Sequence, residues 1–511
     1  MLVKVFGSAV FGVDATTITV EVNTEKGIGY HLVGLPDSTI KESCFRIAAA
    51  LKNNHYQFPG KKIIVNMAPA DLRKEGSAYD LTIAIGILAA SGQINKDKIE
   101  QYVIMGELSL DGSLQPIKGA LPIAIKAREE GFKGFFLPKQ NANEAAIVSD
   151  LEVYGIENVS EIIDFFENKI QLEPIKINTR EDFFKTIDFP EFDFAEVRGQ
   201  ESIKRCMEIA AAGGHNIILI GPPGAGKTML AKRLPSILPP MTLKEALETT
   251  KIHSVAGKSK DSGLINQRPF RAPHHSASSV SLVGGGSYPQ PGEISLAHNG
   301  VLFLDELPEF KREVLEVMRQ PLEDREVTIA RAKFTITYPS SFMLVASMNP
   351  SPSGYFHDSS SKLSSSSNEM QRYMNKISGP LLDRIDLHIE VTPVPFEKLS
   401  DNRPSESSLE IRKRVCKARD IQSLRFEKYD YLHYNAQMTT KQIREYCSLD
   451  DDSLHLLKTA MERLSLSARA YDRILKVSRT IADLENSDDV HAHHIAEAIQ
   501  YRSLDREGWL G

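Results

Sequence analysis

The feature that most constrains the fold of this chain is a glycine-rich octapeptide, GPPGAGKT, at residues 221–228. It fits the pattern GxxxxGK[ST], follows the apolar run Asn216–Ile220 and precedes a stretch of helical character, Met229–Ile237. Glycines in such a loop let successive backbone N–H groups converge on an anion at a helix N-terminus. The sequence therefore predicts a strand–loop–helix unit that binds a nucleoside triphosphate. The predicted phosphate-binding residues are Gly221, Pro222, Pro223, Gly224, Ala225, Gly226, Lys227 and Thr228.

Side chains in and beyond this loop indicate hydrolysis as well as binding. Lys227 can reach the β- and γ-phosphates, and the Thr228 hydroxyl can ligate Mg²⁺. A second apolar run, Val301–Leu304, ends in Asp305 and Glu306. Carboxylates at the C-terminal end of a parallel strand face the crevice where ligands bind. We expect Asp305 to bind Mg²⁺ through water and Glu306 to be the base that activates the attacking water, with ATP and Mg²⁺ as cofactors.

Two further polar residues have two interpretations each. Asn349 follows the apolar run Phe342–Ser347 and could position the lytic water, or could be a turn residue before a proline. Arg384 lies between Asp383 and Asp386. It could stabilise charge on the γ-phosphate of a neighbouring subunit, or form an ion pair with either acid. The residues alone leave both pairs of interpretations open.

Composition and periodicity divide the chain into four segments. Residues 1–170 mix alternating runs with helical runs, and 171–196 form a linker without sustained periodicity. In residues 197–395, apolar strands alternate with helical stretches, which indicates a parallel sheet. Residues 396–511 are almost wholly helical in character. The fold class is therefore α/β, and the 511 residues suit three or four folding units.

Charge and cysteine content exclude several classes of protein. The net charge of −6 and the isoelectric point near 6.2 argue against a protein that coats nucleic acid through its bulk charge. The cysteines form no CxxC pair, which argues against a disulfide framework and suits a reducing cytosol. They are Cys44, Cys206, Cys416 and Cys447. The apolar stretch Leu81–Ala90 is too short to span a bilayer, so we expect a cytoplasmic protein without a membrane partner.

Several motifs extend the argument over nearly the whole chain. They are VGLPD at 33–37, APAD at 68–71, KEGSA at 74–78, RGQ at 198–200, RPFRAPHH at 268–275, GGG at 284–286 and ISGPLLDR at 377–384. On these motifs the chain resembles the YifB/ComM family of AAA+ ATPases, which are related to the magnesium-chelatase motor subunit. The resemblance implies a Lon-protease-like, S5-type N-terminal domain, an AAA+ core and a helical lid.

The family resemblance also implies a function and a set of site residues. It implies an Mg-ATP-driven homo-oligomer, a hexameric ring, that acts as a branch-migration helicase on branched or single-stranded DNA of any sequence. By the same resemblance, the site residues are Arg198, Gly199 and Gln200 near the adenine, Asn349 as sensor 1, Arg384 as the arginine finger and Arg469 as sensor 2. Arg473, one helical turn after Arg469, competes for the last role.

The Lon-like block raises an alternative, an ATP-dependent protease or unfoldase. Ser77 falls where Lon proteases carry their nucleophile, but the position of the lysine base holds Leu121, and Lys118 comes three residues too early. A serine without an activating amine is a weak nucleophile, so we expect no proteolysis. A second alternative is a chelatase-type motor that inserts Mg²⁺ into a porphyrin, against which the 170-residue N-terminal block argues.

Many relatives carry cysteine pairs after the sensor-1 asparagine, whereas this chain has Ser351 and Ser353, on either side of a proline, and the serine run Ser364–Ser367. Serine offers no thiolate ligand, so we expect no zinc there.

The basic stretch between the two ATP motifs is the candidate DNA contact. Its cations are Lys251, Lys258, Lys260, Arg268 and Arg271. Inserted loops of ring ATPases face the central pore, where such residues could follow a phosphate backbone. The alternative is a solvated basic face that only holds the loop in place.

Overall fold

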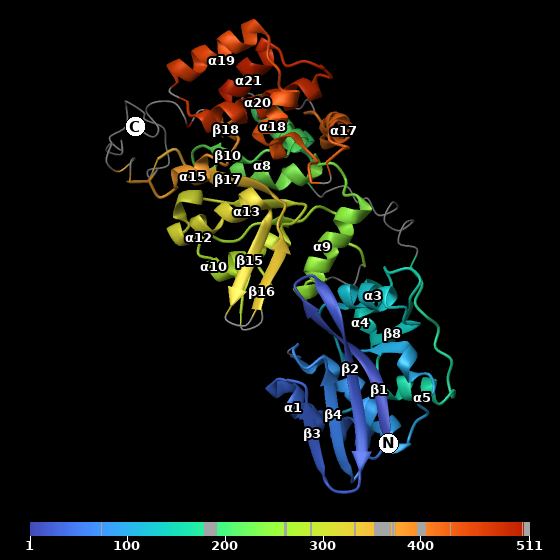
Figure 1. Ribbon diagram of the computed structural model, residues 1–511. Helices are drawn as coiled ribbons and strands as arrows, with labels where there is room; N and C mark the ends of the chain where they lie inside the picture. Colours follow the sequence, from blue (N-terminus) through green and yellow to red (C-terminus); the bar gives the residue numbers. More distant parts are fainter. Residues whose placement is uncertain are drawn as a thin grey trace. The chain divides into compact units, whose positions relative to one another are not determined.

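The computed structural model describes residues 1–511 except 73, 178–191, 260–262, 287–288, 332–333, 352–368, 370–371, 374, 396–404, 430, 465, 503 and 505–511. The chain divides into two compact units (Figure 1). The first comprises residues 1–187, 242–266 and 289–291, and the second comprises 188–241, 267–288 and 292–511.

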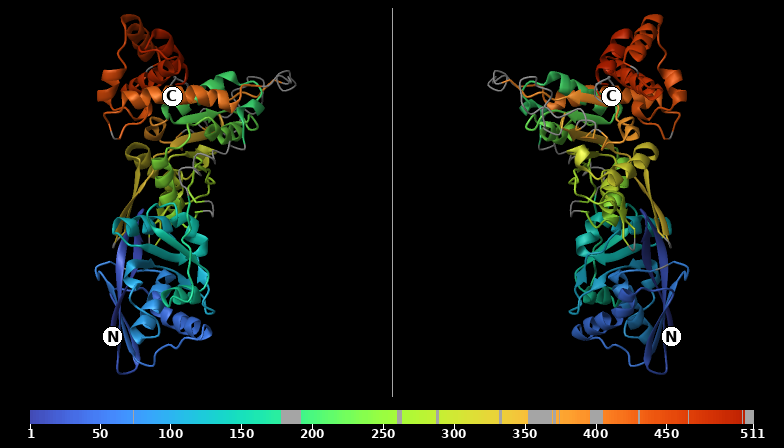
Figure 2. Two further views of the ribbon diagram at one scale, coloured as in Figure 1. Left: turned by 90° about the vertical axis from the view of Figure 1, so that its right-hand side faces the viewer. Right: turned by 90° about the vertical axis from the view of Figure 1, so that its left-hand side faces the viewer.

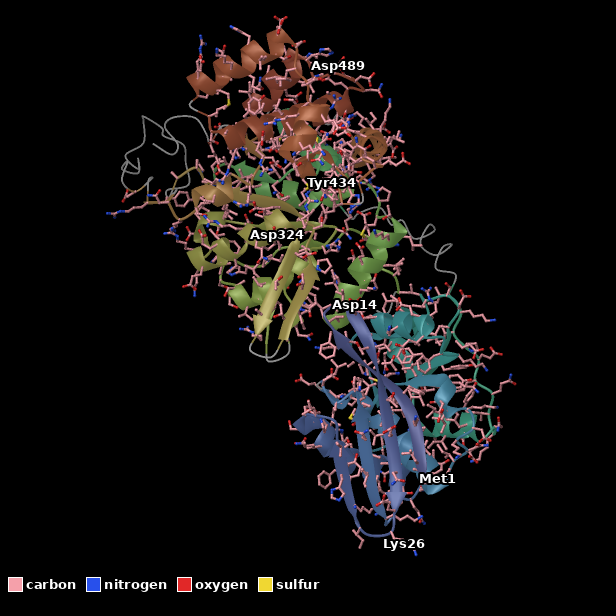
Figure 3. The ribbon with its side chains drawn as sticks, in the orientation of Figure 1. Met1, Asp14, Lys26, Asp324, Tyr434 and Asp489 are labelled. Atoms are coloured by element: carbon pink, nitrogen blue, oxygen red, sulfur yellow. The ribbon has the colours of Figure 1, made fainter. Side chains whose placement is uncertain are left out.

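The first unit is built on a mixed sheet with the strand order β3-β4-β2-β1-β5-β8-β9. Its strands are β1 Leu2–Phe11, β2 Asp14–Glu25, β3 Gly29–Val33, β4 Lys62–Ala68, β5 Tyr102–Ile104, β8 Gly134–Pro138 and β9 Glu152–Ile156. The long antiparallel hairpin of β1 and β2 can be followed in Figure 2, and Figure 3 labels Asp14, the first residue of β2, and Lys26, which follows its last residue. Along β2, buried Ile18, Val20 and Val22 alternate with less buried residues, as in a sheet with one covered face.

Helices supply the rest of the first unit's core. They are α1 Ser38–Asn53, α2 Asp80–Ser91, α3 Ala120–Glu129, α4 Lys139–Ala145, α5 Val159–Phe166 and α9 Leu243–Val255, and a small hairpin joins β6 Glu107–Leu108 to β7 Leu114–Gln115. Residues 80–90 of α2 are all buried. Gly86 allows this helix to lie directly on β2, since a Cβ there would come within 2.6 Å of Val22 Cγ2. A helix that is apolar all round has to be buried in this way.

The second unit contains the parallel sheet that the sequence predicts. Its strand order is β11-β14-β17-β10-β18, and all neighbours run parallel. The strands are β10 Ile217–Ile220, β11 Phe270–Arg271, β14 Val301–Leu304, β17 Met343–Met348 and β18 Leu387–Glu390. All residues of β10, β14 and β17 are buried, as expected for strands covered on both faces. Because these three strands are parallel neighbours, their C-terminal ends meet at one edge.

Short helices and a hairpin surround this sheet. They are α7 Glu201–Gly213, α8 Lys227–Arg233, α10 Ser279–Val283, α11 Glu293–Leu296, α12 Arg312–Val317, α13 Arg319–Asp324 and α15 Gly379–Leu382, with the antiparallel strands β15 Glu326–Arg331 and β16 Phe334–Pro339.

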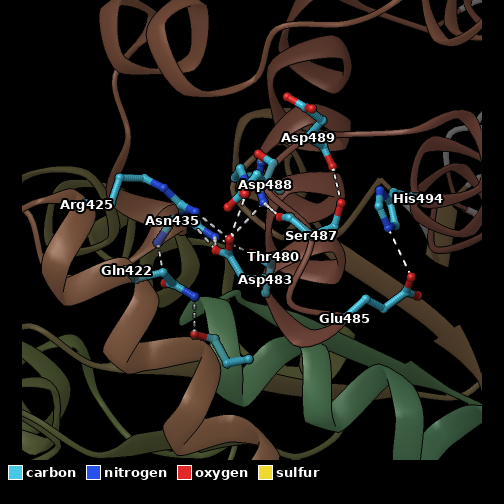
Figure 4. A network of polar contacts seen from close by, with 12 residues as sticks. Gln422, Arg425, Asn435, Thr480, Asp483, Glu485, Ser487, Asp488, Asp489 and His494 are labelled. Atoms are coloured by element: carbon cyan, nitrogen blue, oxygen red, sulfur yellow. Dashed lines mark hydrogen bonds and ion pairs between the residues drawn. The ribbon is translucent and has the colours of Figure 1, made fainter.

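The C-terminal part of the second unit is helical. Its helices are α17 Ser408–Arg425, α18 Thr440–Tyr446, α19 Asp451–Arg463, α20 Ala468–Leu484 and α21 Ala492–Gln500. A buried polar network joins α17 to α20 (Figure 4). Asn435 donates to Asp483 at 2.7 Å, Arg425 donates to the same carboxylate at 2.8 Å, and the Asn435 backbone donates to Gln422 at 3.0 Å. The Gln422 amide in turn donates to the carbonyl of Ala212 on α7 at 3.1 Å, which anchors the helices to the rest of the unit.

One segment groups differently from the sequence-based division. Residues 242–266 lie within the predicted segment 197–395, yet they pack with the first unit. There, α9 begins with a capping box between Thr242 and Glu245, and the carbonyl of Ser254 accepts a hydrogen bond from the backbone of Gly119 at 3.1 Å. In the described part of the chain, no helix combines the length and the apolar character needed to cross a bilayer.

Candidate nucleotide-binding site

The glycine-rich loop joins β10 to α8 in the second unit. Gly224 and Gly226 have φ values of 78° and 90°, a left-handed region that glycine enters without steric cost. The Nζ of Lys227 donates to the carbonyls of Gly221 and Pro222 at 2.7 and 3.0 Å. Burial lowers the pKa of Lys227, whereas Asp305 and Glu306 act in the opposite direction. The lysine is thus folded onto its own loop and faces two carboxylates.

Asp305 follows β14 at the edge where the loop begins. Its Oδ2 accepts a hydrogen bond from the Thr228 hydroxyl at 2.8 Å, and its Oδ1 accepts one from the hydroxyl of Ser347. Ser347 also accepts a hydrogen bond from the backbone N–H of Glu306 at 3.2 Å. A hydroxyl and a carboxylate oxygen side by side form a donor set that suits Mg²⁺, which prefers oxygen ligands. The role of Ser347 was missed from the sequence, because only the β14–β17 pairing brings it beside Asp305.

Glu306 is the more exposed of the two acids. Its backbone adopts the left-handed conformation, with φ 55° and ψ 53°, which is uncommon for a residue other than glycine and is concentrated at functional sites. Its side chain is 54% exposed and its Oε2 lies 3.7 Å from Nδ1 of His275. The His275 ring packs between His274 and Phe310. The carboxylate is therefore available to a ligand in the crevice.

Asn349 directly follows β17, and its Oδ1 lies 3.2 Å from Nζ of Lys227. Its backbone carbonyl accepts a hydrogen bond from the Tyr373 hydroxyl at 3.3 Å. Burial raises the pKa of Tyr373 to about 12, so the hydroxyl keeps its proton. The structure thus brings Asn349 to the loop lysine.

The RGQ motif lies just before α7. Gly199 and Gln200 both adopt left-handed backbone conformations, with φ 61° and 60°, and Arg198 precedes them. The side-chain amide of Gln200 donates to the carbonyl of Ala225 in the glycine-rich loop at 3.3 Å and to that of Thr392 at 3.2 Å. Gln200 therefore borders the loop.

Three arginines of the second unit line one cavity of about 170 Å³. Arg384 donates to Glu323 and to the carbonyl of Pro380, the latter at 2.7 Å. The remaining residues that line it are Leu322, Asp383, Arg469, Asp472, Arg473 and Lys476. The cavity lining includes neither the glycine-rich loop nor Asp305, Glu306 or Asn349.

Arg473 and Arg469 differ in how strongly their ion pairs hold them and in how exposed their side chains are. Arg473 pairs with Asp386 at 2.8 Å, and Asp386 is 2% exposed and also bonded to His215 at 3.2 Å. Burial acts to raise the pKa of Asp386, but Arg473 and His215 hold it well below its usual range. Arg469 pairs with Asp383 at 2.7 Å, and its side chain is 66% exposed.

In the first unit, Ser77 has an acid and not an amine as its partner. Its hydroxyl donates to the carboxylate of Glu107. The Lys118 side chain packs against Gly257, and Leu121 is fully buried. Lys74, close to Ser77 in sequence, donates instead to the carbonyls of Gly34, at 3.1 Å, and Pro69.

The candidate DNA contacts are divided between the two units. Lys251 and Lys258 belong to the first unit, Arg268 and Arg271 belong to the second, and Lys260 lies outside the described residues. Lys251 lies 3.9 Å from Asp14. Arg268 donates to the carbonyls of Pro239 and Asn299 at 2.6 and 2.7 Å, and Arg271 forms a two-point ion pair with Glu293 at 2.6 and 2.8 Å. Both arginines therefore use their guanidinium groups within their own chain.

The serine-rich region in which we expect no zinc lies outside the described residues from 352 to 368. Elsewhere, among the residues that the structure describes, one group with metal-ligand spacing is Glu485, His493 and His494. The Nδ1 of His494 accepts a hydrogen bond from the backbone of His491 at 2.9 Å. Its proton is then on Nε2, the nitrogen that faces Glu485, so this group does not fit a metal ion.

Three family matches cover most of the chain. Residues 193–399 match "Magnesium chelatase, subunit ChlI", residues 20–141 match "Subunit ChlI of Mg-chelatase", and residues 405–502 match "Magnesium chelatase, subunit ChlI C-terminal".

Two curated relatives match over almost their full length. The chain is 45% identical over 507 residues to Competence protein ComM of Haemophilus influenzae, covering 99% of this chain and 98% of that protein. It is 44% identical over 500 residues to Uncharacterized protein YifB of Escherichia coli, covering 98% and 96%. It is also 27% identical over 164 residues to the Lon protease of Mycoplasma mobile, covering 30% of this chain and 19% of that protein.

Proposed function

Since the chain belongs to the YifB/ComM family of magnesium-chelatase-related AAA+ ATPases, with a Lon-like N-terminal part and C-terminal helices, we propose that it is an Mg-ATP-hydrolysing ring motor that acts on DNA, of the branch-migration type. The observation that carries the proposal is the convergence of four residues at one sheet edge. Lys227 contacts Asn349, and Thr228 contacts Asp305. These are the groups that phosphoryl transfer to water requires at one place.

Each of these residues has a distinct role in the proposed hydrolysis. When bound, Mg²⁺ neutralises the charge that develops on the phosphates. Lys227 holds the β- and γ-phosphates, Thr228 and Asp305 hold the metal ion, and Glu306 takes a proton from the attacking water. Asn349 orients that water by a hydrogen bond from its amide. Gln200 borders the glycine-rich loop, and we assign it to the adenine of the nucleotide.

The arginine-lined cavity supports an oligomer. Arg384 and Arg469 lie together there, and the lining contains none of the residues that we assign to the triphosphate. An arginine that serves a γ-phosphate has to contact it. We therefore propose that both arginines act on the nucleotide of a neighbouring subunit, which calls for a closed ring, and that the ring is a hexamer. Arg469 suits the sensor-2 role better than Arg473, whose guanidinium is committed to buried Asp386.

DNA as the substrate rests on the relative named a competence protein and not on a basic surface. Arg268 and Arg271 are bonded within the chain, and Lys251 lies 3.9 Å from Asp14, so we assign no phosphate contact to a particular cation of this stretch. Contacts of this kind would be sequence-independent and weakened by salt.

The experiment that tests the proposal is ATP hydrolysis by the purified protein with and without forked and four-way-junction DNA. We expect turnover that depends on Mg²⁺ and rises with branched DNA, and strand exchange from a junction in the presence of ATP. Turnover that no DNA stimulates would contradict the DNA motor. A complex with a porphyrin-binding protein, and porphyrin metallation that depends on ATP, would instead favour the chelatase-type alternative. The matched family is described as a magnesium chelatase subunit, so this alternative is worth the test.

A further inference from the structure

Glu323 is the acid that contacts Arg384. It lies near the end of α13, and Arg384 follows α15, 61 residues later in the chain. The Arg384 guanidinium donates through one terminal nitrogen to the Glu323 carboxylate and through the other to the carbonyl of Pro380, at 2.7 Å. The arginine is therefore held at two points by two different elements. Two-point contacts of a planar guanidinium fix its orientation as well as its position.

The other two arginine pairs of the cavity show why this contact is distinctive. The Arg473–Asp386 pair is buried and bonded to His215, as a structural ion pair would be. The exposed Arg469–Asp383 pair is of the kind that contributes little and opens readily. In the third pair, the Arg384 side chain is 17% exposed, while Glu323 is 65% exposed. The arginine is thus held against the protein by an acid at the surface.

We propose that Glu323 is a positioning residue. Its carboxylate holds the Arg384 guanidinium in a fixed orientation before the triphosphate of a neighbouring subunit reaches that guanidinium. This inference rests on the proposed function, in which Arg384 serves the γ-phosphate of the neighbour. A free arginine side chain has rotamer entropy to lose when a ligand fixes it. When that entropy is lost in advance, it no longer adds to the barrier of the chemical step.

The charge of Glu323 suits this role. Its hydrogen bond with Arg384 holds the pKa of Glu323 below its usual range, and Arg469 and Arg473 act in the same direction. The acid is therefore ionised at neutral pH and remains a partner for the guanidinium. The two contacts do not use up the guanidinium, because an arginine has five N–H donors and two of them make these contacts. The others stay available to a phosphate.

The test is steady-state ATP hydrolysis by the full-length protein carrying Glu323→Gln. We expect kcat to fall on the order of 10-fold while KM changes less than about 2-fold, since the finger acts in the transition state and not in substrate binding. Glu326→Gln, an exposed acid three residues on, is the matched control and should keep wild-type kinetics. Glu323→Asp keeps the charge and should recover at least about half of kcat. Unchanged turnover in Glu323→Gln would overturn the inference.

A double-mutant cycle separates positioning from a general structural effect. Arg384→Ala should lower kcat on the order of 10³-fold, and adding Glu323→Gln to it should change kcat less than about 2-fold. If Glu323→Gln costs the same factor in both backgrounds, it acts through the fold, and the inference is wrong. If Arg384→Ala alone turns over like wild type, the arginine-finger role in the proposed function fails, and Glu323 has no finger to position. Light scattering on each variant shows whether assembly is retained, and loss of assembly in Glu323→Gln alone would also contradict a positioning role.

Discussion

The Nζ of Lys227 lies 3.2 Å from Oδ1 of Asn349, although the two residues are 122 positions apart in the chain. The register of the sheet explains the contact. β10 and β17 are parallel neighbours with Ile220 opposite Met348, so the residues that follow both strands leave the sheet at the same level. The contact joins the loop that we assign to the phosphates to the amide that we assign to the lytic water.

We predict that Asn349→Ala lowers kcat for ATP hydrolysis on the order of 10²-fold, with KM changed less than about 3-fold, because the amide would act on the water in the transition state. Steady-state kinetics with branched DNA present measures both constants. A rise in KM at unchanged kcat would show instead that Asn349 only supports Lys227 in binding. Asn349→Asp is informative as well, since it keeps the size but adds a negative charge beside Lys227.

Glu306→Gln should lower kcat by about 10² to 10⁴-fold while ATP still binds, because an amide cannot take a proton from water. Equilibrium binding of a fluorescent ATP analogue checks the second half of this statement. Glu309→Gln is the matched control: this nearby acid pairs with Lys376 at 3.2 Å and has no assigned role, so its loss should leave turnover unchanged. If Glu306→Gln hydrolyses ATP at the wild-type rate, the base is another group.

Much of this site can be predicted from the sequence, because its residues follow short apolar strands. The runs Asn216–Ile220 and Val301–Leu304 contain or coincide with β10 and β14, and β17 lies one residue from the predicted run Phe342–Ser347. Strands of this kind are buried on both faces and carry a continuous apolar signal. The helical character of residues 396–511 is equally clear from the sequence, and α17 to α21 lie in this range.

The sequence does not specify which polar side chains form hydrogen bonds and ion pairs with residues far away in the chain. Arg268 and Arg271 contribute to a local count of positive charge, but their partners come from distant residues, Asn299 and Glu293. The count of charges therefore does not reveal that these two arginines make contacts within the chain. Likewise, nothing in the local pattern of α9 shows that it packs with the first unit, because its apolar face would suit either core.

Ser77 should have no peptidase activity. Its hydroxyl donates to Glu107, so the acid could accept the proton, but among the described residues no lysine is bonded to the serine as in a Ser–Lys dyad. We expect no cleavage of casein or of a fluorogenic peptide by the wild type, with or without ATP, and no difference in Ser77→Ala. Cleavage by the wild type that Ser77→Ala abolishes would support the ATP-dependent protease after all. Glu107→Ala tests whether freeing the hydroxyl creates activity, and we expect that it does not.

Lys476 should make the stability of the second unit depend on pH in the alkaline range. This side chain on α20 donates to the carbonyl of Ala436 at 3.0 Å, and burial, assisted by Arg473, lowers the pKa of Lys476 to about 8. An unfolded lysine titrates near about 10.4. Between these two values the unfolded state binds more protons than the folded state, so the free energy of unfolding rises with pH. The rise is up to about 3 kcal/mol, and it is absent below pH 8, where both states carry the proton.

Lys476→Met isolates this contribution from the other titrating groups. In urea titrations from pH 7.5 to 10, the free energy of unfolding of the wild type should increase relative to Lys476→Met by more than about 1 kcal/mol. Lys458→Met, which removes an exposed lysine on α19, is the control and should run parallel to the wild type over the same range. A constant difference between the wild type and Lys476→Met would mean that Lys476 titrates at its ordinary pKa. The cavity would then hold a fully charged lysine beside its three arginines at every pH tested.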